Sequence, residues 1–128
     1  MGAHREVTVK QIWTELELVA AGTTVTSDPI DLSTFAQSGY FTLQYYVQGA
    51  GASVNMTFKL CNDGVNYVDS TEGYKIVTGT TALHDDSGNA RDGRDIIRFT
   101  PTVAPLMKLC AWETQSVGAS LTLSLALQ

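Results

Sequence analysis

The sequence predicts an all-β protein, a single antiparallel β-sandwich of jelly-roll-like or immunoglobulin-like form with about eight to ten short strands. Three observations carry this prediction. Apolar and polar residues alternate with a period of two along the chain, helical spacing is almost absent, and Gly, Pro, Asn or Asp separates the alternating runs. A length of 128 residues suits one domain, 1–128, in which residues 1–6 are expected to form a flexible arm.

The first part of the chain holds two weaker strand patterns. Residues 6–13 (EVTVKQIW) and 16–20 (LELVA) predict either a first strand pair or one long bent strand. Residues 24–32 (TVTSDPIDL) predict a further strand, in which Pro29 marks an edge or a break. Only residues 31–37 could form a helical turn, and this stretch is too short to nucleate a helix alone.

Three segments alternate most clearly, and each predicts a strand with one buried face. They are 40–48 (YFTLQYYVQ), 54–61 (VNMTFKLC) and 121–127 (LTLSLAL). The polar face of 40–48 is also aromatic.

Turn-forming residues flank the remaining predicted strands. Asn62, Asp63 and Gly64 predict a tight reversal, because Asp-Gly readily adopts positive φ angles. Short strands are then expected at 65–68, 75–78, 95–100 and 106–112.

Residues 84–95 (HDDSGNARDGRD) concentrate four acids, two arginines and a histidine. As a helix-loop-helix calcium loop the segment fails, because Ala90 stands where Gly is needed and Ile96 where the bidentate Glu is needed. His84, Asp85 and Ser87 lie too close along the chain to converge as a catalytic triad. An irregular calcium site remains an alternative here, and also at Asp63, Asn66 and Asp69.

We therefore interpret 84–95 as a long exposed connection that contacts a neighbouring subunit, together with the N-terminal segment 1–22. The chain offers no catalytic motif, no phosphate loop and no pair of histidines suited to zinc, so we expect no enzyme, cofactor or metal site. The residues predicted to make subunit or ligand contacts are Tyr40, Tyr46, Trp112, Asp85, Asp86, Arg91, Asp92 and Arg94.

The aromatic residues leave two interpretations open. Tyr40, Tyr46, Tyr67, Tyr74 and Trp112 could form a sugar-stacking platform, or they could belong to the core and to a subunit interface, which we favour. Cys61 and Cys110 are expected to be small buried residues, and a disulfide is conceivable only if their strands are neighbours.

The charge balance narrows the choice of partner. A net charge of −5 without a cluster of Lys and Arg argues against nucleic acid. The chain has no apolar run of membrane-spanning length and no signal peptide, so we expect no membrane partner and synthesis in a cytoplasm. Only 16% of residues are charged, so much of the surface must be neutral, as in a protein packed against copies of itself or another protein.

The order of parts in 27–49, 58–69 and 93–114 resembles the small β-rich virion proteins of tailed bacteriophages and prophages. The likeness lies in an Ile-Asp-Leu-Ser strand end, an Asn-Asp-Gly-Val-Asn turn, a Gly-Arg-Asp loop and a Thr-Pro to Ala-Pro connection. It implies a capsid decoration protein or another accessory head or tail subunit, without catalytic residues. It also implies a homo-oligomer, with a trimer favoured, bound to the major capsid protein or other virion proteins.

The alternative is a carbohydrate-binding or receptor-binding β-sandwich module that uses Tyr40, Tyr46 and Trp112, with calcium at the acidic loops.

Overall fold

The structure, a computed structural model, describes residues 7–18, 23–35, 41–49, 53–69, 75–80, 92–99, 104–114 and 118–128, and only the backbone of 75–80, 92–95 and 99. The described residues form ten strands and no helix. The strands are β1 (Thr8–Leu18), β2 (Val25–Thr26), β3 (Ile30–Asp31), β4 (Phe41–Gln48), β5 (Val54–Cys61), β6 (Val68–Asp69), β7 (Lys75–Thr80), β8 (Asp92–Phe99), β9 (Leu106–Glu113) and β10 (Ala119–Leu127). The arm predicted for residues 1–6 lies outside the described residues.

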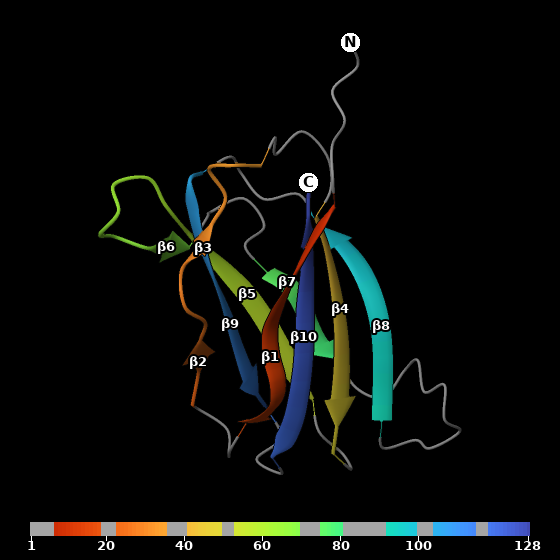
Figure 1. Cartoon of the computed structure of the whole chain (residues 1–128). Helices are drawn as coiled ribbons and strands as arrows, with labels where there is room; N and C mark the ends of the chain where they lie inside the picture. The colour runs from red at the N-terminus through yellow and green to blue at the C-terminus, as the bar shows by residue number, and fades with distance from the viewer. Residues whose placement is uncertain are drawn as a thin grey trace.

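The strands form two antiparallel sheets that pack face to face (Figure 1). Sheet A has the order β1-β10-β4-β8. In sheet B, β5 and β9 pair in the middle, β2 and β3 share the free side of β9, and β6 and β7 pair with β5. The predicted all-β sandwich is therefore confirmed.

The strand order distinguishes between the two predicted forms of sandwich. If β2 is counted with β3 and β6 with β7, the described residues form eight strands. Their pairing is nested: the first strand pairs with the last, the second with the seventh, the third with the sixth and the fourth with the fifth. This is the strand order of a jelly roll, in which a long hairpin of strand pairs folds up so that successive pairs lie alternately in the two sheets. The fold is thus jelly-roll-like rather than immunoglobulin-like.

The core lies between the sheets and follows the predicted alternation. From sheet A, β10 contributes four leucines, each at most 1% exposed, and β4 contributes Phe41, Leu43, Tyr45 and Val47. Met56, Phe58 and Leu109 face them from sheet B. Fully burying one such side chain contributes about 1.5–3 kcal/mol, so these rows hold the two sheets together.

The first predicted strand is one long bent strand, β1, rather than a strand pair. Its register against β10 shifts between Gln11 and Trp13 and again between Trp13 and Leu16. Glu15 has a φ of 49°, which is unusual for a residue with a side chain. Gln11 Nε2 donates to Trp13 O at 2.8 Å, and Glu15 N donates to the Thr122 hydroxyl at 3.0 Å. Side chains thus satisfy backbone groups where the bulges interrupt the ladder.

Pro29 divides the second predicted strand into β2 and β3. Ser27 bridges the break: its N–H donates to Leu109 O at 2.8 Å, and Leu109 N donates to the Ser27 hydroxyl at 2.9 Å. Leu32, just after β3, starts the short turn predicted near 31–37, because Phe35 N donates to Leu32 O at 3.1 Å. The edge of sheet B therefore continues past a residue that has no N–H.

Three predictions about segments need correction. Residues 65–67 are not strand, because the Asp63 carboxylate accepts the N–H groups of Val65 and Asn66 that a strand would pair. Residues 92–95 are not an exposed loop, because they continue β8 in register with β4 as far as Gln48 opposite Asp92. The segment 1–22 is not an arm throughout, because 11 of its 22 residues form β1, a strand of sheet A, and its contact with neighbours stays a prediction.

Candidate functional site

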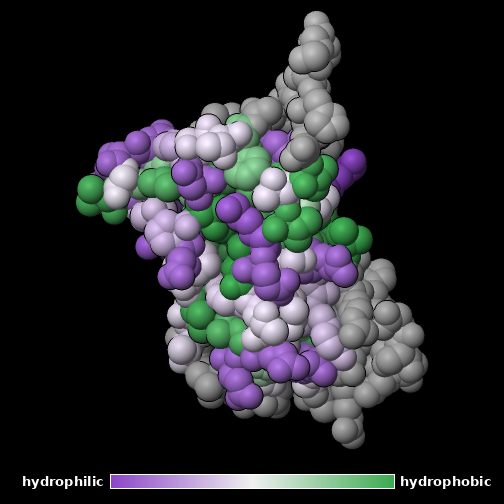
Figure 2. Space-filling view, viewed as in Figure 1, coloured by the Kyte–Doolittle hydropathy of each residue, from purple (hydrophilic) through white to green (hydrophobic). Residues whose placement is uncertain are grey.

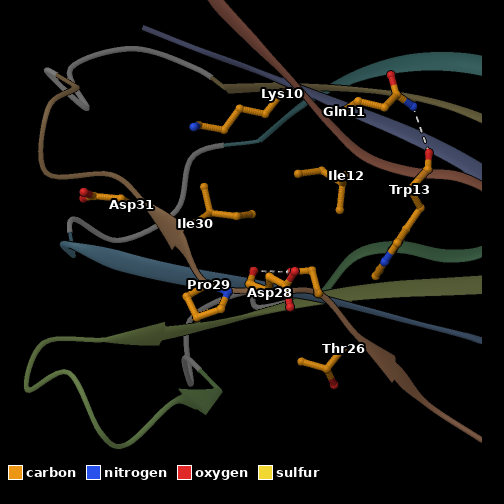
Figure 3. Close-up of a pocket in the computed structure, with 10 residues that line it drawn as sticks. Lys10, Gln11, Ile12, Trp13, Thr26, Asp28, Pro29, Ile30 and Asp31 are labelled. Carbon is orange, nitrogen blue, oxygen red and sulfur yellow. Dashed lines mark hydrogen bonds between the residues drawn. The ribbon is translucent and has the colours of Figure 1, made fainter.

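A groove opens between the edges of the two sheets, where β1 of sheet A lies opposite β2 and β3 of sheet B (Figure 3). Its volume is about 640 Å³, within the range of about 300–1,000 Å³ common for ligand sites. The groove is lined by Lys10, Gln11, Ile12, Trp13, Thr26, Ser27, Asp28, Pro29, Ile30 and Asp31.

The middle of the groove is apolar and one end is charged. Ile12 and Ile30 face each other across it, with Trp13 beside them, and Lys10 extends toward the end where Asp31 lies (Figure 3). Within the described part of the chain no ion pair joins Lys10 to Asp31. The Ser33 hydroxyl and N–H donate to the Asp31 carboxylate at 2.6 and 2.9 Å, and these hydrogen bonds, helped by Lys10, lower the pKa of Asp31.

Among the described residues, the lining of the groove includes one serine. Its serine, Ser27, donates to Asp28 O at 3.0 Å and accepts from Leu109 N, so its hydroxyl is committed to the sheet edge. No histidine or cysteine is among the described residues that line the groove. Among the described residues, no three His, Cys, Asp or Glu side chains are grouped as a metal site requires.

A second feature is the outward face of sheet A. Its two central strands present only uncharged side chains there: Thr42, Gln44, Tyr46 and Gln48 from β4, and Ser120, Thr122, Ser124 and Ala126 from β10. Figure 2 views the molecule from this side, where pale and purple side chains dominate the middle. A shallow depression of about 270 Å³ is lined by Gln11, Gln44, Tyr45, Tyr46, Thr122 and Ser124.

The outward face of sheet B differs from that of sheet A. Trp112 pairs with Asn55, and Lys108 pairs with Lys59, on the side away from the core. Each lysine has a nearby partner: Lys59 Nζ lies 3.1 Å from the Asp69 carboxylate, and Lys108 Nζ lies 4.2 Å from the centre of the Tyr67 ring. These contacts offset the repulsion of two like charges placed directly opposite each other.

The predicted aromatic platform does not form from Tyr46 and Trp112. Tyr46 lies on the outward face of sheet A and Trp112 on that of sheet B, with the core between them. Asp92 and Arg94 are in β8, opposite Gln48 and Tyr46 in the register. Tyr40, Asp85, Asp86 and Arg91 lie outside the described residues, as does Tyr74.

Asp63 organises the turn after β5. Its carboxylate accepts Val65 N at 2.9 Å, Asn66 N at 2.8 Å, Asn66 Nδ2 at 2.8 Å and the Cys61 thiol at 3.2 Å. These hydrogen bonds, led by that of the Asn66 N–H, hold the pKa of Asp63 far below its usual value of 3.8. The carboxylate is therefore committed to the turn, which weighs against the alternative of calcium at Asp63, Asn66 and Asp69.

We expect this turn to make the fold sensitive to acid. Because the folded pKa of Asp63 is depressed, its stabilisation is fully present above the unfolded pKa near 3.8 and is lost as the pH falls through the folded pKa. The stability difference between wild type and Asp63→Asn, measured by urea unfolding, should be largest near neutral pH and shrink below pH 3.8. Asp28→Asn, at an exposed aspartate of the groove, is the control, and a difference independent of pH would contradict the assignment.

Cys61 and Cys110 are both buried, as predicted, and neither forms a disulfide. Their strands, β5 and β9, are neighbours, but Cys61 pairs with Leu106 and Cys110 with Thr57. Four residues of strand correspond to about 13 Å, which is too far for a disulfide.

Two features were not predicted from the sequence. The groove depends on where the edges of two different sheets meet, for which the sequence carries no local signal. Glu113, which ends β9, is 0% exposed and lies on the inner face opposite Val54. Its Oε2 accepts Ser53 N at 3.1 Å and its Oε1 accepts Gly118 N at 3.3 Å. The only available signal was its position at the end of an alternating run.

The described residues contain no helix that could cross a membrane. Comparison of the chain with family models, with curated proteins and with solved structures finds no match.

Proposed function

We propose that this protein is a non-enzymatic structural component of a bacteriophage virion, most simply a self-associating capsid decoration protein or another accessory head or tail subunit. On this proposal it is made in the cytoplasm of the bacterial host and resides in the virion. Its partners are copies of itself and the major capsid protein or other virion proteins, and neither nucleic acid nor a membrane is involved.

The observation that carries the proposal is the uncharged outward face of β4 and β10. Eight outward side chains on these two strands include no charge, although the chain as a whole carries a net charge of −5. The cores of protein interfaces are depleted in charged residues, because a buried charge must be desolvated, and they are enriched in tyrosine. This face shares two features with an interface core, the lack of charge and a tyrosine, Tyr46, near its middle.

The fold adds support by analogy. Jelly rolls occur in viral capsid proteins and in lectins, so the architecture fits both a virion subunit and a sugar-binding module. Fold alone does not decide between them, since one architecture hosts many functions. The uncharged face over the whole width of two strands favours the virion subunit.

A test uses phage particles purified from the lysate of the bacterium that makes the protein. Wild-type protein should co-sediment with the particles at a fixed copy number. Ser124→Arg places a charge in the centre of the uncharged face and should weaken binding about tenfold or more. Asn62→Arg, which adds the same charge at the exposed turn after β5, is the matched control and should bind as wild type. Absence of the protein from the particles would contradict the proposal.

The alternative, a carbohydrate-binding module, is favoured by one observation, the depression around Tyr46. Amide and hydroxyl groups of Gln11, Gln44, Thr122 and Ser124 surround the ring there, and such groups suit a neutral sugar. In a glycan array, binding that Tyr46→Ala abolishes would establish this alternative in place of the virion role, whereas particle binding without glycan binding would exclude it.

A further inference from the structure

The outward face of sheet A carries an exposed isoleucine beside its uncharged strands. Ile96 is in β8, directly opposite Gln44 of β4, and it is 61% exposed. Its neighbour Ile97 lies opposite the buried Leu43 and packs against the core, so the alternation places Ile96 outward, on the same face as Gln44. One exposed apolar side chain is ordinary on a protein surface. What gives this one a meaning is the surface beside it.

A recess lies on the other side of β4. It is the depression of about 270 Å³ over β4 and β10, whose wall includes Gln44 and Ser124. In the register, one row of outward positions crosses the face from Ser124 in β10 through Gln44 in β4 to Ile96 in β8. The isoleucine and the wall of the recess are thus at the same level of the sheet, each about 4.8 Å from β4 and on opposite sides of it (Figure 1).

A two-fold axis along β4 would bring these two features together. When two copies pack face to face about such an axis, β8 of each copy lies over β10 of the other, and β4 lies over β4. Ile96 of each copy then lies against Ser124 of the other, at the wall of its depression, and Tyr46 lies against Tyr46. Arg98, further along β8, comes opposite Ala126 at the margin of the contact, where interfaces are polar. Aligned strands of this kind are usual for stacked sheets.

Other two-fold arrangements of this face leave the depression without an apolar occupant. An axis across the strands sets each depression over the depression of the other copy, and Ile96 over β8. An axis along β10 sets β4 over β1, so Ile96 lies beyond the contact. Of the three arrangements, the axis along β4 is the one that seats the isoleucine.

We propose that the uncharged face of sheet A packs against the same face of a second copy of this chain, about a two-fold axis along β4. This contact names the partner of the face on which the proposed function depends, and so it rests on that proposal. Three strands of eight or nine residues cover about 400 Å² of plane per copy, which is at the low end of interface sizes. We therefore expect a weak dimer. The contact is isologous and closed, so it does not make the trimer that the resemblance implied.

The first measurement is the native mass of the isolated protein. Sedimentation velocity should show a monomer of 13.8 kDa that gives way to a species of twice this mass as the concentration rises from about 1 μM to about 1 mM. A monomer throughout this range, or an assembly larger than a dimer, would overturn the inference.

Charged variants test the register. Ile96→Asp and Ser124→Arg each place an unpaired charge in the contact, and each alone should raise the dissociation constant about tenfold or more. In an equimolar mixture the two variants should form a heterodimer of about wild-type strength. The new carboxylate of one copy then lies against the new guanidinium of the other, and the second contact of Ile96 with Ser124 is intact. A mixture as monomeric as the separate variants would overturn the register.

The matched control is Val68→Asp. Val68 is in β6 of sheet B and is 61% exposed, as Ile96 is, so the same charge is added at equal exposure away from the contact. This variant should dimerise as wild type does, and a loss equal to that of Ile96→Asp would overturn the assignment of the face.

The outcomes separate this inference from the proposed function. A dimer of the isolated protein that is absent from phage particles would support the contact and contradict the virion role. Binding to particles by a protein that stays monomeric in isolation would support the virion role and overturn the contact. A monomer whose depression binds a glycan would also overturn it.

Discussion

Glu113→Ala should lower the free energy of unfolding by about 2–5 kcal/mol, because one buried and one half-buried N–H lose their acceptor and a buried donor left unpaired costs about 1–3 kcal/mol. The Glu113 carboxylate accepts the N–H of Ser53, just before β5, and the N–H of Gly118, just before β10. It thus ties the end of β9 to the starts of one strand in each sheet. No other residue type of this size could accept at both oxygens without a competing donor.

Glu113→Gln is the matched variant. Glutamine keeps the shape of the side chain and one acceptor oxygen, but it turns the second position into a donor that faces another donor. Its expected loss is smaller than that of the alanine variant, about 1–2 kcal/mol. Urea unfolding followed by tryptophan fluorescence measures both. If the alanine variant proved as stable as wild type, the role assigned to the carboxylate would be wrong.

Leu123→Ala should be destabilising by about 3–5 kcal/mol, the range for truncating a well-packed core leucine. Leu123 is 0% exposed and sits mid-strand in β10, between Trp13 of β1 and Tyr45 of β4. Removing its side chain leaves a cavity under three strands of sheet A, and the large rings on either side cannot shift far into it without losing their own contacts.

The neighbouring position supplies the control for Leu123. Ser124 lies on the outward face of the same strand, and Ser124→Ala should change the unfolding free energy by no more than about 0.5 kcal/mol. Calorimetry or urea unfolding of the pair compares the two faces of one strand. Equal losses at the two positions would contradict the assignment of inner and outer faces.

The fold class could be predicted from the sequence because the alternation of apolar and polar residues shows which side chains of a strand face the core. The alternation in 54–61 and 121–127 states which side chains are inward, and the structure agrees with it at Met56, Phe58 and Leu123. The alternation does not show which strands are neighbours in a sheet. The choice between a jelly roll and an immunoglobulin-like sandwich therefore needed the structure.

The candidate site could be predicted only in part, for a related reason. Tyr46 and Trp112 were each correctly placed on strands, but the sequence does not say that their two outward faces lie on opposite sides of the core. At 65–67 the strand prediction was wrong because the side chain of Asp63 competes for the backbone donors. The groove arises where the edges of β1 and β3 meet, so no single stretch of residues could have revealed it.

The nested pairing of the strands has a consequence for how the chain folds. Thr8 lies opposite Leu127, so β1 can take its place in sheet A only after the last strand has been synthesised. β4 pairs with β10 on one side and β8 on the other, and both follow it at long distances along the chain. Domains dominated by such distant contacts fold slowly, on a scale of about milliseconds to seconds. During translation β1 therefore emerges long before β10, its partner in sheet A.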